Sequence, residues 1–251
     1  MLEELVPPQV AVAERFDDAP ADVMFPEEAA VIGNAVDKRR REFRTVRACA
    51  RDALGQLGWP PAPILPGEQG APRWPAGLVG SMTHCDGYRA SAVARAADMA
   101  SLGIDAEPNA ALPDGVLGLI SLPAERVMLA TLAAATAGAC AARAGGVRGA
   151  AGPCWDRILF SAKESVYKAW FPLTRRWLSF EEAAVTISPA DGAFTARLLV
   201  PGPVVGSRPL RAFEGRWLVR QGLILTVITV PAGSRPGAAQ RTPSGRPCRG
   251  R

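Results

Sequence analysis

The sequence predicts an α+β fold of two similar halves, residues 1–115 and 116–230, each a helix packed on a mainly antiparallel sheet. In each half, one long stretch repeats apolar residues at three- and four-residue intervals, which is typical of a helix with one buried face. Each half also has short runs rich in β-branched and aromatic residues between turn signals, which is typical of strands. A chain of 251 residues is long enough to bury a substantial core.

The first half is expected to begin with irregular chain over residues 1–25. A short helix should start at Pro26, because proline is favoured in a first helical turn. A longer helix is expected over residues 35–57, with Gly58 ending it. After a loop rich in proline and glycine, strands are predicted over residues 78–83, 89–95 and 100–106.

The second half is expected to open with an alanine-rich helix over residues 123–142, followed by a flexible connection over 144–152. The next helix should be capped by Asp156 and end at Pro172. Strands are predicted over 183–187, 194–200, 216–220 and 223–230, the last two joined by a Gln221-Gly222 hairpin turn. Residues 231–251, rich in Pro, Gly, Ser and Arg, predict a disordered tail.

Composition limits the classes of function. No run of eighteen apolar residues occurs and the first residues lack a signal pattern, so a cytoplasmic protein without a membrane partner is expected. Five scattered cysteines without C-x-x-C spacing argue against a disulfide framework or a zinc site. The net charge of +5 fits an acidic partner, which could be a nucleic acid, a phosphorylated small molecule or an acidic protein.

Lysine is rare in this chain, and its placement is informative. Only three lysines occur among 29 basic residues, and two of them, Lys163 and Lys168, flank Glu164 in the stretch 160–170. An ammonium is a compact point charge whereas guanidinium is a planar fork, so retained lysines suggest an anionic substrate beside a carboxylate. The other interpretation is an ordinary surface ion pair on a helix, which contributes about 0.2–0.5 kcal/mol.

Two carboxylates follow each other in the third predicted strand. Asp105 and Glu107 are two residues apart, so their side chains lie on one face of the strand. Such a pair suits a hard, oxygen-liganded cation such as Mg²⁺. The alternative is a pair of acids on a solvated strand edge that ends at Pro108.

The chain has one histidine, His84, and it follows Ser81 and Thr83 at the end of a predicted strand. This arrangement is common in phosphate-binding sites, although a histidine satisfied within a core or loop is the other interpretation. The arginine stripe on the first long helix could be a solvated face or a nucleic-acid footprint. No aromatic stacking set accompanies it. The stripe consists of Arg40, Arg44, Arg47 and Arg51, with Arg39 near its edge.

Three segments, G-S-M-T-H-C (80–85), G-I-D-A-E-P (103–108) and F-S-A-K-E-S-V-Y-K-A-W (160–170), together resemble the 4′-phosphopantetheinyl transferases. The resemblance is to the long, two-halved type typified by enterobactin synthetase component D and covers about residues 25–230. Further matches include W-D-R-I-L (155–159) and W-F-P-L-T (170–174). Two departures stand out: residues 66–69 lack the basic residues usual in that loop, and Asn109 replaces a common histidine.

The resemblance implies a reaction and its partners. Such enzymes transfer the 4′-phosphopantetheine arm of coenzyme A to a serine of an acyl or peptidyl carrier protein, giving the holo carrier and 3′,5′-ADP. The acceptors would be apo carrier domains of polyketide, peptide or siderophore synthases, and the enzyme a monomer that binds no nucleic acid. Two rival hypotheses are a non-catalytic relative that binds coenzyme A or a carrier domain as a scaffold, and an arginine-rich nucleic-acid-binding protein.

The resemblance also implies residue roles in a cleft between the halves. Asp105, Glu107 and Glu164 would hold Mg²⁺, or Mn²⁺, on the diphosphate. Asp105, Lys163 and Glu164 would be catalytic: Lys163 would neutralise charge, and Glu164, directly or through a metal-bound water, would be the base. The coenzyme A contacts would come from Arg39, Arg47, Thr83, His84, Asp105, Lys163 and Lys168.

Overall fold

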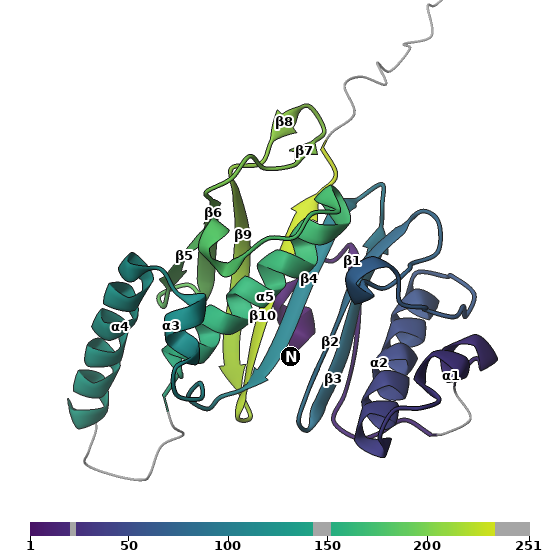
Figure 1. Ribbon diagram of the computed structural model, residues 1–251, viewed down its shortest axis with the longest axis horizontal. Helices are drawn as coiled ribbons and strands as arrows, with labels where there is room; N and C mark the ends of the chain where they lie inside the picture. The colour runs from purple at the N-terminus through teal and green to yellow at the C-terminus, as the bar shows by residue number, and fades with distance from the viewer. Residues whose placement is uncertain (21–23, 143–151, 234–251) are drawn as a thin grey trace, which may run out of the picture.

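A computed structural model describes residues 1–20, 24–142 and 152–233 and has the expected α+β architecture (Figure 1). The smaller sheet has the strand order β1-β3-β2, with all neighbours antiparallel, and α2 packs on it. Its elements are η1 (Leu2–Leu5), β1 (Val10–Arg15), α1 (Pro26–Ile32), α2 (Asp37–Gln56), η3 (Glu68–Gly70), β2 (Leu78–Cys85) and β3 (Tyr88–Arg95).

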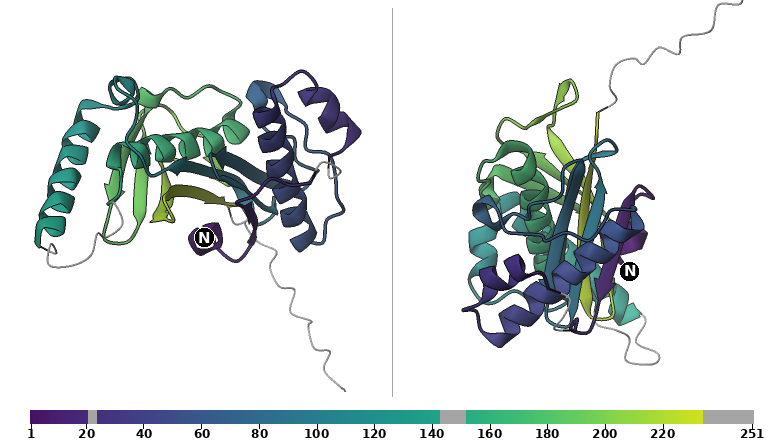
Figure 2. Two further views of the ribbon diagram at one scale, coloured as in Figure 1. Left: turned by 90° about the horizontal axis from the view of Figure 1, so that it is seen from below. Right: turned by 90° about the vertical axis from the view of Figure 1, so that its right-hand side faces the viewer.

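The larger sheet is antiparallel with the order β4-β10-β9-β6-β5, and α5 crosses one of its faces. Figure 2 shows α4 at one end of the molecule, α1 and α2 at the other, and α5 between them. The elements are β4 (Met99–Pro108), α3 (Val116–Ile120), α4 (Pro123–Ala142), α5 (Trp155–Thr174), η4 (Phe180–Glu182), β5 (Ala183–Ser188), β6 (Ala193–Leu198), β7 (Val204–Val205), β8 (Arg208–Pro209), β9 (Ala212–Arg220) and β10 (Leu223–Pro231).

The predicted hairpin is confirmed: Gln221 and Gly222 both have positive φ, 53° and 75°, as the turn between β9 and β10 requires. The prediction that residues 1–25 are irregular is wrong, because residues 10–15 form β1 at the edge of the smaller sheet. That strand alternates valine with alanine, so its two faces do not differ in polarity and the period of two is invisible in the sequence.

The predicted ends of α5 are also wrong. Asp156 lies inside the helix and accepts a hydrogen bond from the Leu112 amide, 2.9 Å away, instead of capping it. Pro172 is inside the last turn, and the helix ends only when Arg175 adopts a left-handed conformation. A proline there removes a single backbone hydrogen bond. The predicted flexible connection, apart from Gly152, and the predicted tail from residue 234 onward lie outside the described residues.

The two sheets meet where β2 lies beside β4, and side-chain hydroxyls join them. The Ser81 hydroxyl accepts a hydrogen bond from the Ile104 amide at 3.1 Å, and the Thr83 hydroxyl accepts one from the Ala106 amide at 3.0 Å. Although β4 falls within the predicted first half, it pairs with β10 and belongs to the larger sheet. The division of the chain into two halves at residue 115 stays a prediction.

Every second residue of β4 contacts α5, and successive contacts on α5 are about four residues apart. Ser101 donates to the Ala169 carbonyl oxygen at 2.8 Å, and Asp105 accepts from the Ser161 hydroxyl at 2.8 Å. Between them, a Cβ added to Gly103 would lie 2.0 Å from the Ser165 carbonyl oxygen. Two strand residues advance about 6.7 Å and four helical residues about 6 Å, so the two elements stay in step along their length.

Gly103 is therefore required by the close approach of α5. We expect Gly103→Ala to lower the free energy of unfolding by about 1–3 kcal/mol, because the helix must move away from β4. Gly55→Ala on α2 is the control, because a Cβ there meets nothing within 4 Å and alanine is the better helix former, by about 0.5–1 kcal/mol. Urea denaturation of both variants measures the difference, and an unchanged midpoint for Gly103→Ala would contradict the packing.

Candidate active site at the junction of the two sheets

Asp105 lies where the two sheets and α5 meet, and it is nearly fully buried. Its Oδ1 accepts a hydrogen bond from the Lys168 ammonium at 2.7 Å, and its Oδ2 accepts one from the Ser161 hydroxyl at 2.8 Å. The Thr83 hydroxyl on β2 lies 3.4 Å from the same Oδ1. One carboxylate thus contacts β2 and two positions of α5, which makes it the centre of the site.

Lys168 is bound on one side and open on the other. Its ammonium also donates to the Ile104 carbonyl oxygen at 3.0 Å, and its side chain is partly exposed. An ammonium has three hydrogens to donate. Two of them are used by β4 in the part of the chain that the structure describes, so a third can reach an anion placed at the junction.

Glu107 and Glu164 share the electrostatic environment of Asp105. The pKa of each is raised, first by burial and then by the negative charge of Asp105. The Arg157 guanidinium opposes the shift at Glu107, which it contacts at 2.9 Å, and Lys168 opposes the shift at Glu164. Carboxylates that destabilise one another's charged form are stabilised by a cation bound between them.

The donor set is therefore chemically suited to a hard divalent cation, which prefers carboxylate oxygens. Within residues 1–20, 24–142 and 152–233, no group of three His, Cys, Asp or Glu side chains is arranged to hold a metal ion. Two of the three predicted metal ligands are instead held by the internal cations Lys168 and Arg157.

Lys163, expected to neutralise charge on the diphosphate, contacts α4 and the start of β5 rather than the carboxylates around Asp105. Its ammonium is buried and pairs with Glu125 of α4 at 2.9 Å. It also donates to the carbonyl oxygens of Phe180 at 2.7 Å and Ala183 at 3.1 Å. Burial lowers its pKa, against the Glu125 charge. With three acceptors already bound, this lysine joins α5 to α4 and to the start of β5.

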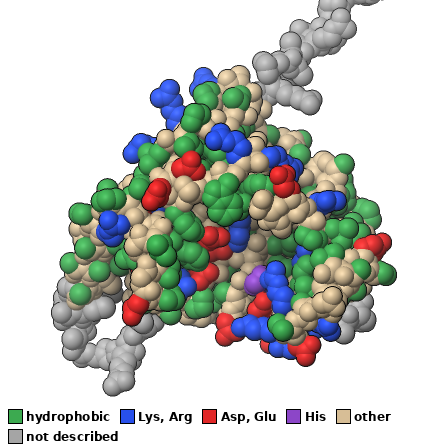
Figure 3. Space-filling model, viewed as in Figure 1, with side chains coloured by type: hydrophobic (Ala, Val, Ile, Leu, Met, Phe, Trp, Pro, Cys, Tyr) green, Lys and Arg blue, Asp and Glu red, His purple; other side chains and the backbone are tan. Residues whose placement is uncertain are grey.

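His84 lies near the end of β2 and contacts the first two turns of α2. The Arg39 guanidinium donates to its Nε2 at 2.7 Å, and Glu42 lies 3.7 Å from its Nδ1. Burial lowers its pKa and the positive charges of Arg39 and Lys168 lower it further, against the effect of Glu42. Figure 3 shows basic and acidic side chains gathered around this histidine in the middle of the face between the halves.

Two other predicted phosphate contacts are already bonded within the protein. Arg47 is buried, donates from Nε to the Ile64 carbonyl oxygen at 2.7 Å, and lies over the Phe43 ring. Burial lowers its pKa to about 10. The Thr83 hydroxyl is buried between Asp105 and the Ala106 amide. The structure therefore brings Thr83, Asp105, Glu107, Glu164 and Lys168 together, sets Arg39 and His84 beside them, and encloses Arg47.

Sequence reasoning missed Ser161, Arg157 and Tyr167. Ser161 is three residues before Glu164, a helical spacing that could have found it. Arg157 contacts Glu107 from the start of α5, which the sequence does not signal. The Tyr167 hydroxyl is buried without a hydrogen-bond partner among the described residues, and burial, followed by the nearby charge of Glu164, raises its pKa.

The structure shows the surroundings of the two places where the sequence departs from the family pattern, residues 66–69 and Asn109. In the loop at residues 66–73, a Cβ at Gly67 would lie 3.2 Å from the side chain of Arg73, so a guanidinium lies over a loop that otherwise lacks positive charge. Asn109 accepts from the Cys154 amide at 2.9 Å and donates to the Gly152 carbonyl oxygen at 3.2 Å. Its role here is to anchor the chain that enters α5.

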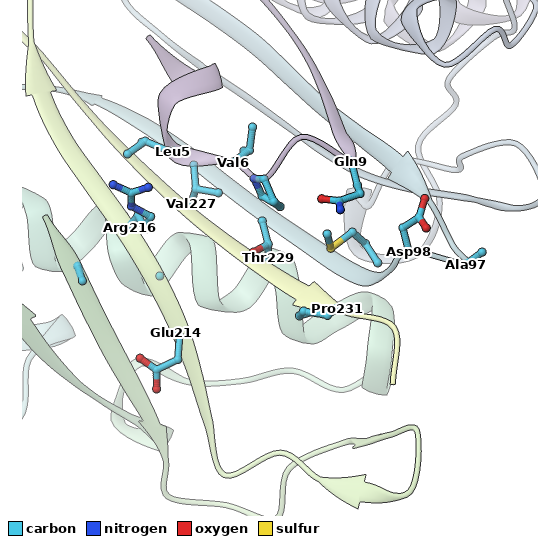
Figure 4. A pocket seen from close by; sticks show the side chains of 14 residues that line it. Leu5, Val6, Gln9, Ala97, Asp98, Glu214, Arg216, Val227, Thr229 and Pro231 are labelled. Carbon is cyan, nitrogen blue, oxygen red and sulfur yellow. The ribbon is translucent and has the colours of Figure 1, made fainter. Parts of the chain in front are cut away.

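A hollow of about 890 Å³ lies on the face of the larger sheet opposite α5, between the N-terminal segment and strands β9 and β10 (Figure 4). Its walls include Leu5, Val6, Arg216, Val227 and Thr229, and none of the predicted site residues lines it. The convergence of charged groups at Asp105, rather than the volume of this hollow, therefore locates the candidate site.

Two family models match consecutive parts of this sequence. Residues 27–94 match the 4′-phosphopantetheinyl transferase N-terminal domain, and residues 101–208 match the 4′-phosphopantetheinyl transferase superfamily. The 4′-phosphopantetheinyl transferase Svp of Streptomyces mobaraensis is 57% identical over 245 residues, covering 96% of this chain and 94% of that protein.

Two further relatives have the same description. The 4′-phosphopantetheinyl transferase PptT of Mycobacterium tuberculosis is 50% identical over 226 residues, covering 88% of this chain and 92% of that protein. The 4′-phosphopantetheinyl transferase Npt of Nocardia iowensis is 48% identical over 237 residues, covering 91% and 99%. The family predicted from the three segments is confirmed: the chain belongs to the 4′-phosphopantetheinyl transferase superfamily.

Proposed function

We propose that this protein transfers the 4′-phosphopantetheine arm of coenzyme A to a serine of a carrier protein and releases 3′,5′-ADP. The observation that carries the proposal is the contact of Asp105 with Lys168, which places a carboxylate of β4 and an ammonium of α5 beside Glu164. Phosphoryl-type transfer needs this combination, because the enzyme must bind a polyanion and also accept a proton from the attacking hydroxyl.

Each site residue has a distinct proposed role. Lys168 donates its remaining hydrogen to a diphosphate oxygen. Glu164 accepts the serine proton on its carboxylate, directly or through a water. Asp105 holds Lys168 in place. Lys163, tied to Glu125, acts by holding α5 rather than by touching the diphosphate.

Asp105, Glu107 and Glu164 would hold Mg²⁺, or Mn²⁺, since a hard divalent cation prefers carboxylate oxygens as ligands. When bound, the ion would neutralise part of the diphosphate charge. Arg39 and His84 are the proposed contacts to the nucleotide phosphates, because they are the more accessible pair. Arg47 and Thr83 are proposed to support this surface from beneath, since each is bonded to a neighbouring segment.

The proposed acceptors are apo carrier domains of polyketide, peptide or siderophore synthases, and the proposed enzyme is a cytoplasmic monomer. Among the described residues, no helix is both long enough and apolar enough to span a membrane.

The direct experiment is to incubate the protein with an apo carrier protein, coenzyme A and Mg²⁺ and to measure the mass of the carrier. A gain of one phosphopantetheine group supports the proposal. Tight binding of coenzyme A without any gain in mass would favour the scaffold function instead.

We expect Asp105→Asn and Glu164→Gln each to lower turnover by about 100-fold or more, the range for loss of acid–base and electrostatic groups. Asp105→Asn should also cost about 1–3 kcal/mol of stability, because a buried charge-assisted bond to Lys168 is weakened. Glu164 is partly exposed, so Glu164→Gln should change the free energy of unfolding by no more than about 0.5 kcal/mol. Asp114→Asn, an exposed carboxylate of the same half, is the control. Wild-type turnover in either site variant would contradict the assignment.

We expect Arg39→Gln and His84→Gln each to weaken coenzyme A binding by about ten- to a hundredfold, since a charge-assisted phosphate contact contributes about 1.5–3 kcal/mol. The same variants should bind dephospho-coenzyme A with a smaller loss if either residue holds the 3′-phosphate. Arg95→Gln is a matched control. Arg95 on β3 lies opposite Leu78, the first residue of β2, whereas His84 is near the other end of that strand. Calorimetry measures both ligands, and equal losses for Arg39 and Arg95 variants would rule out a specific contact.

A further inference from the structure

Arg157 binds three acceptors in the segment that follows β4. Its Nη1 donates to Oε2 of Glu107 at 2.9 Å, its Nε to the Ala110 carbonyl oxygen at 3.0 Å, and its Nη2 to the Ala111 carbonyl oxygen at 2.8 Å. The residue is in the first turn of α5, seven positions before Glu164. One guanidinium therefore connects Glu107 with the helix that carries Glu164.

The neighbouring contacts show that this end of α5 is anchored independently of Arg157. Asn109 bonds to Gly152 and Cys154, and Asp156 accepts from the Leu112 amide. These three bonds join backbone to side chain and do not touch a site carboxylate. Arg157 adds what they lack, a direct contact to a carboxylate of the candidate site.

The contact is well shielded, with the side chains of Arg157 and Glu107 only 15% and 19% exposed. The two carbonyl acceptors fix the plane of the guanidinium, and the plane in turn fixes the direction of the third bond to Glu107. A lysine would replace three coplanar nitrogens by one compact ammonium, so it would not keep the planar fork that directs the bond to Glu107. Arginine is therefore the side chain that this geometry requires.

We propose that Arg157 is a positioning residue for the transfer reaction. It holds Oε2 of Glu107 and leaves Oε1 for the divalent cation, at a fixed place relative to Glu164. The inference rests on the cation site of the proposed function. Hydrogen-bond partners of metal-binding side chains typically change metal affinity by about 10–100-fold when removed.

The test measures binding of Mn²⁺ by the loss of its free electron paramagnetic resonance signal, with and without coenzyme A and without carrier protein, so that no turnover occurs. We expect Arg157→Ala to weaken Mn²⁺ binding by about 10–100-fold. Arg157→Lys should weaken it too, although the charge is kept, because the fork is lost. In a Glu107→Gln background, Arg157→Ala should cause little further loss, since the effect passes through Glu107.

Arg126→Ala is the matched control, because Arg126 also donates to a carbonyl oxygen, that of Ser121, but does not contact a site carboxylate. It should lower the melting temperature without changing Mn²⁺ affinity. If Arg157→Ala does not fold, Arg157→Lys and its double variant with Glu107→Gln carry the test alone.

The outcomes separate this inference from the proposed function. If Glu107→Gln binds Mn²⁺ like the wild type, Glu107 is not a ligand of the cation, and the inference about Arg157 is contradicted. If Glu107→Gln binds weakly while both Arg157 variants bind normally, the cation site stands and Arg157 has no positioning role. Tighter Mn²⁺ binding by Arg157→Ala would mean that the guanidinium competes with the cation, which also overturns the proposal.

Discussion

The register between β4 and α5 is the constraint on which the rest of the site depends. Along it, Ser101, Gly103, Asp105 and Glu107 meet Ala169, Ser165, Ser161 and Arg157 in turn. The match works because two strand residues and four helical residues advance by nearly the same distance. A shift of one residue in β4 would turn both carboxylates to the other face. The same packing that builds the core thus places the acidic side chains of the strand against the basic and acidic side chains of the helix.

Internal cations make this arrangement possible in a partly buried location. Lys168 and Arg157 each hold one carboxylate of β4, and Lys163 holds Glu125 on the other side of α5. A charge buried without a partner is strongly destabilising, so each pair satisfies a group that the fold has removed from water. The three pairs differ in exposure: the Lys168 side chain is the most exposed of the three cations, which suits it to bind a substrate phosphate, whereas Lys163 is closed in. In the proposed function, the transfer chemistry therefore uses charges that the fold already requires.

The sequence predicted those features that depend on local periodicity. Asp105 and Glu107 lie on one face, and the apolar stripe of α5 from Ile158 to Ala169 is buried, because both follow from the period of a strand or helix. Long-range partners could not be read in the same way. Lys163 and Lys168 look equivalent in the sequence, and only the fold shows that one meets Glu125 and the other Asp105. Strand β1 was missed because alternating valine and alanine give no contrast between its faces.

A crystal structure of the protein with coenzyme A and Mg²⁺ tests the register and the site together. We expect Asp105 to keep its contact with Ser161 and Glu107 its contact with Arg157. The cation should lie about 2.0–2.1 Å from oxygens of Asp105, Glu107 and Glu164, the usual distance for Mg²⁺. The Lys168 ammonium should contact the diphosphate. A cation bound away from Asp105, or a complex in which β4 and α5 meet in a different register, would contradict this account.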